Sequence, residues 1–406
     1  MGHHTSADGG GRFDHLFASI TESMELASPW GGYPAFENSS AIPLTYGYPA
    51  PELLPVERLQ SAVSTVFSTD GADALQYSGG ELQAALVREL QQCATRAGLR
   101  PSCDEILTTS GSSHALEGIC RTFLEPGDPV FVEVPTYLGV LHTFDGYGAE
   151  VVPVPLDHHG IDVDAFERQL RSVKESDRPL PSLLFTIPNF QNPTGATLSR
   201  DRRERLIALA EAYDFVIVED DVYGALRYDG TEIPSLGALD SAGRVISIGS
   251  LSKLIAPGVR TGWIVADADL IPVLRRCLPS GGSSFIQSIV AAYCRDEDLQ
   301  GHIPRLCAAY RDRRDRLVEA LGTHLPASAD WIVPAGGFFV WLTIDGVDTA
   351  ELLPHAAEVG VTYFPGAMFH PDDRPRSNLR LSFSYVSPDD LETGAAALGQ
   401  ALHEWM

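Results

Sequence analysis

Lys253 is the first residue whose type and position suggest chemistry. Only two of the 29 basic residues are lysines, Lys174 and Lys253. Lys253 lies between the apolar runs 244–248 and 263–266, where we expect two buried strands. A buried amine costs free energy unless its charge is paired or its nitrogen is used. Lys253 is therefore either the nucleophile that forms a Schiff base with a carbonyl compound, or a lysine at a strand end whose ammonium reaches solvent.

An acidic and an aromatic residue follow another expected strand, residues 215–219. Asp220 comes directly after this strand, and a carboxylate at the end of a buried strand needs a cationic partner. A protonated pyridine nitrogen would be such a partner, and Tyr223 could then reach the phenolic oxygen of the same ring. Asp221, in contrast, is explained equally well by a solvated acidic turn.

A possible anion site lies in the segment Ser110-Gly111-Ser112-Ser113, directly before a helix that we expect from His114. Small residues at a helix N-terminus allow backbone N–H groups to approach a phosphate, which the helix dipole also favours. A simple helix cap would explain the same residues. Arg260 follows Lys253 by seven residues, and its planar guanidinium suits a phosphate.

Two further polar residues occur where they need a partner. Asn192 begins the turn Asn-Pro-Thr-Gly after the expected strand 183–187, and its amide would project over the same crevice. Arg380 lies within the apolar strand that we expect at 379–383. A guanidinium in that position must pair with a carboxylate, which belongs either to the protein or to a substrate.

The elements that must position these residues predict an α/β fold. Apolar strands alternate with helical segments from residue 105 to residue 266, which is typical of a mainly parallel sheet covered by helices on both faces. Ligands bind beyond the carboxyl ends of the strands in such sheets. From about residue 303 the pattern changes to that of a smaller α+β domain. The expected strands are residues 105–108, 130–134, 151–154, 183–187, 215–219, 245–248 and 263–266, and the expected helices between them are residues 114–123, 163–172 and 200–213.

We predict four parts in the 406-residue chain. Residues 1–40 form an N-terminal arm that packs on a partner subunit, with apolar residues at helical spacing between residues 13 and 26. Residues 41–75 contribute the N-terminal part of the small domain and a linker. Residues 76–295 form the large domain, and residues 296–406 form the C-terminal small domain.

The composition excludes several classes of protein. A net charge of −25 disfavours nucleic acid as a partner, because its phosphates would be repelled. No apolar run approaches the roughly 20 residues that a membrane-spanning helix needs. The six cysteines contain no Cys-x-x-Cys pair, so we expect reduced thiols in the cytoplasm and no metal site.

Together these motifs resemble the fold-type I pyridoxal 5′-phosphate (PLP) enzymes of the aspartate aminotransferase superfamily, class I/II. The resemblance is strongest to the α-aminoadipate and aromatic aminotransferase branch, and it extends from about Pro43 to the C-terminus. It rests on residues 188–195, residues 219–223, and residues 250–253 together with residues 260–263. It implies the PLP-dependent transferase fold and a cytoplasmic homodimer with shared active sites.

The resemblance also assigns roles to single residues. Lys253 carries the Schiff base, Asp220 contacts the pyridine nitrogen, and Asn192 and Tyr223 contact the ring oxygen. Arg380 takes the substrate α-carboxylate, with Asn192 and the backbone of Gly47 nearby. Tyr137 stacks on the ring face, and Tyr77 contacts the phosphate of the cofactor in the neighbouring subunit. The phosphate in the same subunit is bound by Gly111, Ser112, Ser113, Ser250 and Arg260.

The resemblance implies an aminotransferase that converts an α-amino acid into a keto acid through a quinonoid intermediate. An alternative is an enzyme that uses the quinonoid for elimination, replacement or cyclisation at Cβ or Cγ in specialised biosynthesis. A third reading is the aminotransferase-like sensor domain of a transcription regulator. An acidic arm of about forty residues is shorter than the roughly sixty of a winged-helix module, which disfavours that reading.

Three departures from the family pattern leave the side-chain specificity and the net reaction open. The turn after Tyr77 is shorter than the Tyr-x-Pro-x-x-Gly loop of this branch. His114 stands where glutamine is common. The segment Ser280-Gly-Gly-Ser-Ser284, which we expect to face the partner's site, has no clear counterpart.

Overall fold

The computed structural model describes residue 16 and residues 40–77, 80–176, 178–278, 281–295, 298–372 and 374–406. The predicted arm and its helix lie outside these residues, apart from residues 16 and 40. Residues 78–79 of the turn after Tyr77 and Ser280 also lie outside them. Within the described part of the chain, no helix is long and apolar enough to cross a membrane.

The main sheet has eight strands in the order β2-β9-β8-β7-β6-β3-β4-β5. Five neighbouring strands, β8, β7, β6, β3 and β4, are parallel to one another. The strand β9 is antiparallel to both of its neighbours, β8 and β2. The mainly parallel sheet predicted from the sequence is therefore confirmed. The strands are β2 (Ile106–Thr109), β3 (Pro129–Val134), β4 (Glu150–Asp157), β5 (Gly160–Ile161), β6 (Leu183–Thr186), β7 (Val216–Asp220), β8 (Val245–Ser250) and β9 (Gly262–Val265).

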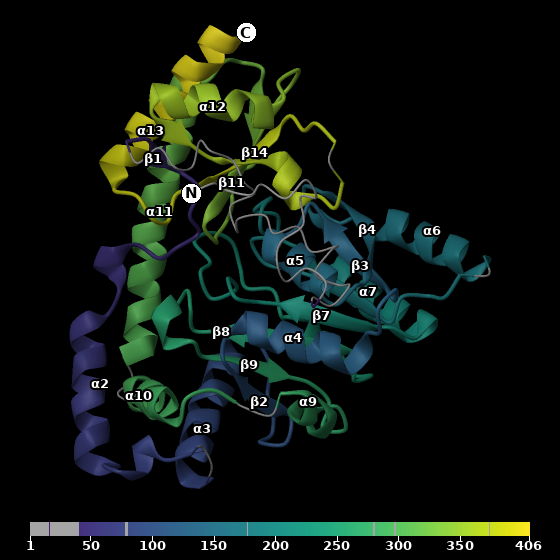
Figure 1. Cartoon of the computed structure of the whole chain (residues 1–406), viewed down its shortest axis with the longest axis vertical. Helices are drawn as coiled ribbons and strands as arrows, with labels where there is room; N and C mark the ends of the chain where they lie inside the picture. Colours follow the sequence, from purple (N-terminus) through teal and green to yellow (C-terminus); the bar gives the residue numbers. More distant parts are fainter. Residues whose placement is uncertain are drawn as a thin grey trace, which may run out of the picture.

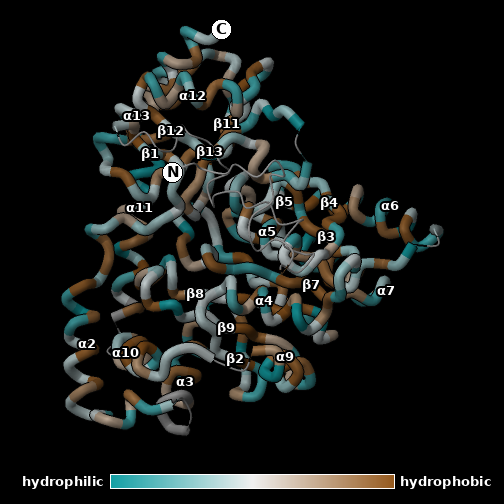
Figure 2. The backbone as a smooth tube through the Cα atoms, viewed as in Figure 1, coloured by the Kyte–Doolittle hydropathy of each residue, from teal (hydrophilic) through white to brown (hydrophobic). Residues whose placement is uncertain are grey.

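Helices cover both faces of this sheet (Figure 1). On one face Ile119, Phe144 and Leu274 pack on the strands. They come from α4 (Ser112–Phe123), α5 (Leu138–Gly146) and α9 (Ile271–Cys277). On the other face Phe166, Leu206 and Leu236 do the same. They come from α6 (Val163–Lys174), α7 (Arg200–Tyr213) and α8 (Leu236–Leu239). Apolar residues on both sides of a strand explain its near-continuous apolar sequence, and Figure 2 shows such hydrophobic stretches in β7 and the strands beside it.

A second, antiparallel sheet has the order β10-β11-β14-β13. The short β1 (Ile42–Pro43) pairs in parallel with β12 (Val361–Thr362), so the first described strand joins the C-terminal part of the chain. The smaller α+β part is therefore present as predicted. Its strands are β10 (Ala329–Trp331), β11 (Phe339–Ile344), β13 (Phe364–Pro365) and β14 (Asn378–Ser382), and its helices are α11 (Asp298–His324), α12 (Thr349–Val359) and α13 (Pro388–Trp405).

The remaining elements connect the two sheets or lie beside the larger one. The helix α10 contacts both α2 and α3 next to the main sheet. Their bounds, with those of the short 3-10 helices, are α2 (Val56–Thr69), α3 (Gly80–Arg96), α10 (Ser284–Arg295), η3 (Pro51–Leu53), η4 (Asp73–Leu75), η5 (Pro257–Val259) and η6 (Gly366–Phe369).

Close contact between β8 and β9 yields a prediction for stability. Gly249 pairs with Trp263, and a Cβ at Gly249 would lie 2.1 Å from the indole ring. We expect Gly249→Ala to lower the free energy of unfolding by about 2 kcal/mol, because the buried strand and indole would have to shift. Urea unfolding of the cofactor-free protein measures this change.

The matched control is Gly322→Ala on the exposed side of α11, where nothing lies within 4 Å of the added methyl group. This change should stabilise the protein by roughly 0.5 to 1 kcal/mol through helix propensity. Equal effects of the two substitutions would contradict the close packing described for Gly249.

Candidate active site

Lys253 lies in the turn that follows β8, at the carboxyl end of the parallel strands. Its Nζ donates a hydrogen bond of 2.8 Å to the carbonyl oxygen of Gly47. Burial and the positive charge of Arg380 lower the pKa of Lys253 to about 8, although the charge of Asp220 opposes this. A substantial fraction of the amine is therefore neutral near pH 7 to 8, which is the form that attacks a carbonyl carbon.

Asp220 ends the neighbouring strand β7 and is only 8% exposed. Burial raises the pKa of its carboxyl group to about 7, while a hydrogen bond from the backbone of Val222 and the charge of Lys253 act in the opposite direction. Its Oδ1 is buried and has no hydrogen-bond partner among the described residues. A buried acceptor in this state fits a ligand that brings a proton or a positive charge.

Tyr223 and Asn192 lie beside this pair. Tyr223 is 5% exposed, and burial raises the pKa of its hydroxyl group. Its ring packs edge-on against Phe338 and Phe339, with centroids 5.5 and 5.9 Å away. Asn192 accepts a hydrogen bond of 2.8 Å on Oδ1 from Arg380, which leaves its Nδ2 available to a ligand.

Arg380, on β14, is a buried cation that has no carboxylate partner in the described part of the chain. It is 3% exposed, and burial lowers its pKa to about 10. Its terminal nitrogens donate to Asn192 and, at 2.7 Å, to the carbonyl oxygen of Thr45. The described residues form no ion pair with it, and its Nε has no partner there. Internal pairing with a protein carboxylate, one of the two alternatives from the sequence, is therefore not observed in the described part of the chain.

Three aromatic rings take the place of a carboxylate around Arg380. Its guanidinium carbon lies 4.0 Å from the ring centroid of Phe339, 4.9 Å from that of Phe364 and 5.0 Å from that of Phe369. Cation–π contacts of this kind stabilise a desolvated charge by about 2 kcal/mol or more each. The charge therefore stays available to the carboxylate of a ligand.

The residues predicted to bind a phosphate lie where β2 and β8 end and the antiparallel β9 begins. Gly262 on β9 pairs with Ser250 on β8 and with Thr109 on β2. A Cβ at Gly262 would lie 2.9 Å from the backbone of Gly111, so only glycine allows these segments to approach. Gly111 has a positive φ of 92° and caps α4, whose first residues are Ser112 and Ser113.

Arg260 completes this group of residues. Its Nη2 donates a hydrogen bond of 3.0 Å to the carbonyl oxygen of Ser110 and lies 2.7 Å from the position of a Cβ on Gly111. The Oγ of Ser250 accepts a hydrogen bond of 3.1 Å from the backbone N–H of Ser252. A helix N-terminus, serine hydroxyls and a guanidinium thus surround one small space, which suits a phosphate.

Tyr137, Gly47 and Tyr77 differ in their positions. Tyr137 precedes α5. Burial raises the pKa of its hydroxyl group, and the positive charge of Arg380 opposes this rise, whereas Asp220 and Tyr48 add to it. It therefore lies near the other site residues. Gly47 contacts Lys253 through its carbonyl oxygen, and a Cβ there would lie 2.6 Å from the ring of Phe339. Tyr77 is fully exposed and does not join the group within one protomer.

The sequence analysis did not identify two residues beneath the site, Glu133 and Gln191. Glu133 is 1% exposed and accepts hydrogen bonds from Thr186, Ile187 and Gln191. The available signal was a single glutamate within the apolar run 130–134, because a carboxylate in such a strand requires several donors.

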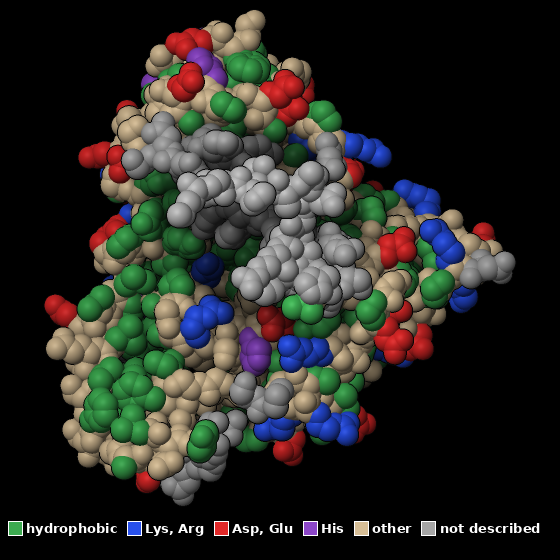
Figure 3. All heavy atoms as spheres, viewed as in Figure 1, with side chains coloured by type: hydrophobic (Ala, Val, Ile, Leu, Met, Phe, Trp, Pro, Cys, Tyr) green, Lys and Arg blue, Asp and Glu red, His purple; other side chains and the backbone are tan. Residues whose placement is uncertain are grey.

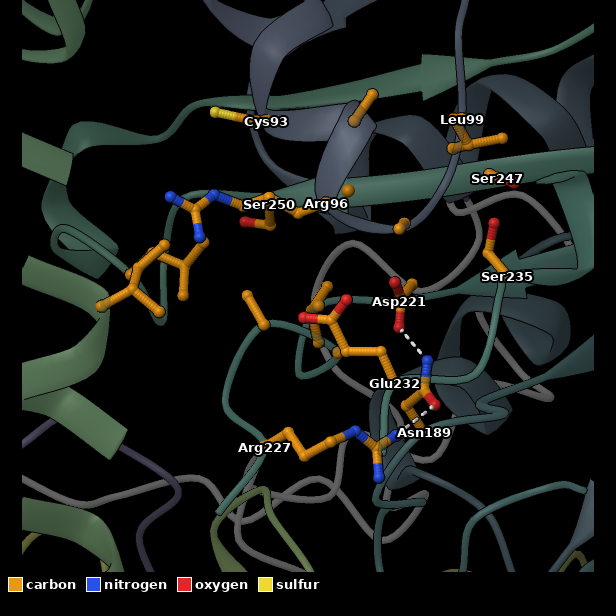
Figure 4. Close-up of a pocket in the computed structure, with 18 of the residues that line it drawn as sticks. Cys93, Arg96, Leu99, Asn189, Asp221, Arg227, Glu232, Ser235, Ser247 and Ser250 are labelled. Atoms are coloured by element: carbon orange, nitrogen blue, oxygen red, sulfur yellow. Dashed lines mark hydrogen bonds between the residues drawn. The ribbon is translucent and has the colours of Figure 1, made fainter. Parts of the chain in front are cut away.

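A cavity of about 430 Å³ lies next to the site and is lined in part by Ser250 (Figure 4). Asp221 lines it, whereas Asp220 and Lys253 do not. Asn189 donates a hydrogen bond of 2.7 Å to Asp221 and accepts a longer one of 3.4 Å from Arg227. Asp221 is therefore a half-buried, hydrogen-bonded residue and not part of a freely solvated turn.

The grouped residues fit a small phosphorylated ring that carries an aldehyde and a basic nitrogen. The unpartnered carboxylate oxygen of Asp220 fits a protonated ring nitrogen, and the amine of Lys253 fits the aldehyde. The close approach of Gly111, Gly262 and Arg260 leaves backbone and guanidinium groups for the phosphate. Arg380 remains for the carboxylate of a second ligand.

Comparison with known proteins agrees with this arrangement. The sequence matches the family described as aminotransferase class I and II over residues 47–398. It is 38% identical over 378 residues to aromatic-amino-acid aminotransferase 1 of Thermococcus litoralis. The aligned region covers 91% of this chain and 90% of that protein.

Two solved structures have the same fold. Kynurenine aminotransferase of Pyrococcus horikoshii, in complex with PMP, has a TM-score of 0.91 and 36% identity, and the match covers 98% of this chain and 99% of that chain. The α-aminoadipate aminotransferase of Thermus thermophilus, in complex with N-(5′-phosphopyridoxyl)-L-leucine, has a TM-score of 0.86 and 29% identity. That match covers 97% of this chain and 98% of that chain.

The buried carboxylate predicts an unusual effect on stability in the protein without a ligand. The folded state holds the proton of Asp220 more tightly than the unfolded state does, since its pKa is about 7 instead of its ordinary value. The ionised carboxylate therefore lowers stability above pH 7, and this cost vanishes as the pH falls below the unfolded pKa. We expect Asp220→Asn to raise the free energy of unfolding on the order of 2 kcal/mol at pH 8, and less at pH 5.

Urea unfolding at the two pH values measures this difference. The control is the exposed Asp104→Asn, which should change stability by no more than about 0.5 kcal/mol at either pH. A loss of stability in Asp220→Asn at pH 8 would show that the carboxylate has a favourable partner in the free protein.

Proposed function

The chain belongs to the aminotransferase class I and II family, and on this basis we propose that it transfers the amino group of an α-amino acid to a keto acid with PLP as its cofactor. PLP is the cofactor of this family. The observation that supports the proposal most directly is the shared crevice of Lys253, the unpartnered Asp220 and the buried Arg380.

The cofactor would be held by residues from five strand ends or turns. Lys253 would bind its aldehyde carbon, and Asp220 would keep the ring nitrogen protonated. Asn192 and Tyr223 would contact the ring oxygen, and Tyr137 the ring face. The phosphate would be bound by Gly111, Ser112, Ser113, Ser250 and Arg260. When bound, PLP withdraws electrons from the Cα–H bond of the substrate.

Residues of this chain would carry the proton and the substrate charge. With a pKa of about 8, the amine of Lys253 can accept the proton from the substrate Cα near neutral pH. Arg380 would bind the α-carboxylate bidentately, because its planar guanidinium matches that group. The phenylalanine rings around Arg380 keep water away from this charge, which strengthens its interaction with a carboxylate.

Aromatic side chains beside Gly47 support aromatic amino acids as the preferred substrates. Tyr46 and Tyr48 stack with centroids 5.2 Å apart, and Tyr385 packs edge-on against them at 5.8 and 5.9 Å. Tyr48 is 44% exposed, so part of its ring can contact a ligand. A substrate ring could pack on this cluster with a geometry that aromatic pairs favour. The relative from Thermococcus litoralis has a name that points to the same class.

We also propose a homodimer whose partner completes each site. Tyr77 is fully exposed in the protomer, although its phenol would suit a phosphate of the neighbouring subunit. Val56, Phe67 and Leu75 are exposed nearby in the chain, and Figure 3 shows hydrophobic side chains gathered over the region of α2 and α10. A second copy on this face would bury them.

The cysteines are in keeping with an enzyme of the cytoplasm. All six are free thiols in the structure. A reducing compartment keeps thiols in this state. We therefore propose that the protein works there.

The proposed reaction predicts a defined stoichiometry. With phenylalanine or tyrosine and no keto-acid acceptor, the PLP-loaded protein should release one equivalent of keto acid per site and then stop, because the amino group stays on the enzyme. Mass spectrometry of the product and the cofactor absorbance measure this result, with Lys253→Ala as the inactive control. Continued turnover with release of ammonia would contradict transamination and favour elimination chemistry.

The tyrosine cluster gives a separate prediction for specificity. Tyr48→Ser should lower kcat/KM for phenylalanine by about tenfold, since roughly 1.4 kcal/mol of ring contact is lost. The value for alanine, which cannot reach the cluster, should change by less than about threefold. Equal losses for both amino acids would place Tyr48 outside the substrate pocket without affecting the proposed reaction.

Shared sites predict complementation between two inactive variants. In a mixed dimer of Tyr77→Ala and Lys253→Ala, one site combines an intact Lys253 with an intact Tyr77 from the other subunit. Mixing and refolding should restore activity to about half of the sites in each mixed dimer, whereas each variant alone stays low. Sedimentation of the wild type as a monomer, or no gain on mixing, would contradict the proposal.

A further inference from the structure

A buried carboxylate that the proposed reaction does not use lies beneath the site. Glu133 stands near the carboxyl end of β3 and is 1% exposed. Its Oε2 accepts a hydrogen bond of 2.6 Å from the hydroxyl of Thr186. Its Oε1 accepts one of 2.7 Å from the backbone N–H of Ile187 and one of 3.1 Å from Gln191. Three donors from the end of β6 and the following loop therefore converge on one side chain.

Gln191 uses all of its polar atoms in the same network. Its Nε2 donates to Glu133 and, at 2.8 Å, to the carbonyl oxygen of Pro135. Its Oε1 accepts from the backbone N–H of Thr194 at 2.9 Å and from the hydroxyl of Thr194 at 2.7 Å. The side chain is 1% exposed, so these bonds do not compete with water.

This network connects the two loops that carry predicted cofactor contacts. Pro135 lies two residues before Tyr137, and Gln191 lies directly before Asn192. β3 and β6 are neighbours, but their ladder pairs Phe131 with Leu184 and Val132 with Phe185 and extends no further. Beyond the ladder, the side chains of Glu133 and Gln191 replace backbone pairing between the two segments.

We propose that Glu133 and Gln191 are positioning residues that fix the Tyr137 loop and the Asn192 loop relative to each other, and thereby set the affinity for the cofactor. The inference rests on the proposed function only in taking Tyr137 and Asn192 as cofactor contacts. Neither Glu133 nor Gln191 acts on the substrate. Both act through the residues that they hold.

The chemistry of the site explains why a glutamate occupies this position. Burial raises the pKa of Glu133 to about 7, so the carboxylate is costly here, and the three hydrogen bonds offset part of that cost. A glutamine of the same shape keeps only one acceptor oxygen. Its amide nitrogen would face Thr186, whose hydroxyl would have to reverse its hydrogen bond. Glu133→Gln therefore weakens the network with little change in volume.

A second buried glutamate at the same edge of the sheet provides the matched control. Glu219 is fully buried and also accepts three hydrogen bonds, from the backbone of Leu236 and Gly237 and from the hydroxyl of Ser247. These donors belong to α8 and β8 and not to either of the two loops. Glu219→Gln should lower stability to a similar extent without the same effect on the loops.

The first measurement is a titration of the cofactor-free protein with PLP, followed by absorbance. Glu133→Gln and Gln191→Ala should each weaken PLP binding by about tenfold, whereas the exposed Asp104→Asn should change it by less than about threefold. The double variant Glu133→Gln/Gln191→Ala should bind no more than about threefold more weakly than either single variant, because the two residues act as one unit. Independent, additive losses would overturn the proposal.

The second measurement does not depend on the cofactor. Hydrogen exchange of backbone amides in residues 189–196 should become about tenfold faster in cofactor-free Glu133→Gln, but not in Glu219→Gln. Unchanged exchange in Glu133→Gln, or equal acceleration in both variants, would overturn the positioning role. If the wild type failed to bind PLP, the proposed function would be wrong, while this exchange experiment would still test the connection between the loops.

Discussion

The structure is organised around a buried acid and a buried amine that lack a complete set of partners. Among the described residues, Asp220 has an oxygen without a donor, and Lys253 donates only to the backbone carbonyl oxygen of Gly47. Both lie at the carboxyl ends of adjacent parallel strands, where chain connectivity leaves a crevice. Burial moves the pKa of Asp220 up to about 7 and that of Lys253 down to about 8, so each group is held away from its most stable charged state. A ligand that brings a protonated nitrogen and an aldehyde would relieve both costs at once, which supports the proposal that the site binds such a ligand.

The alternation of side chains along a strand explains why three consecutive carboxylates, Glu219, Asp220 and Asp221, have different hydrogen-bond partners. Side chains along β7 point alternately to opposite faces of the sheet. Glu219 accepts a hydrogen bond from Leu236 of α8 and Asp221 accepts one from Asn189, whereas the Oδ1 of Asp220 has no donor among the described residues. The site therefore has one unsatisfied carboxylate between two satisfied ones. Glu133 on β3 repeats the satisfied arrangement, with three hydrogen-bond donors from β6 and the loop that follows it.

Local patterns were sufficient to predict the sheet and the strand-end residues, since both depend on short stretches of sequence. Residues 215–219 and 245–248 are apolar runs followed by polar residues, and the parallel sheet brings their ends together. The helix α10 was not predicted, because its residues 289–294 form a short continuous apolar run, which does not by itself distinguish a buried helix from a buried strand. The antiparallel direction of β9 was also not readable, since an apolar strand does not record its direction. The contact of Arg380 with Asn192 joins residues 188 positions apart, and no local pattern determines such a pair.

That contact also explains how one residue can join two sheets and still bind a ligand. Arg380 on β14 donates to Asn192 from the large-sheet side and to Thr45 from the N-terminal segment. An ion pair with a protein carboxylate would hold the same segments together, but it would neutralise the charge and leave no reason for a carboxylate ligand to bind. Neutral oxygens and phenylalanine rings stabilise the guanidinium while leaving its positive charge uncompensated. The same choice of neutral partners therefore contributes to the fold at this point and leaves a positive charge for the carboxylate that we propose as a second ligand beside Lys253.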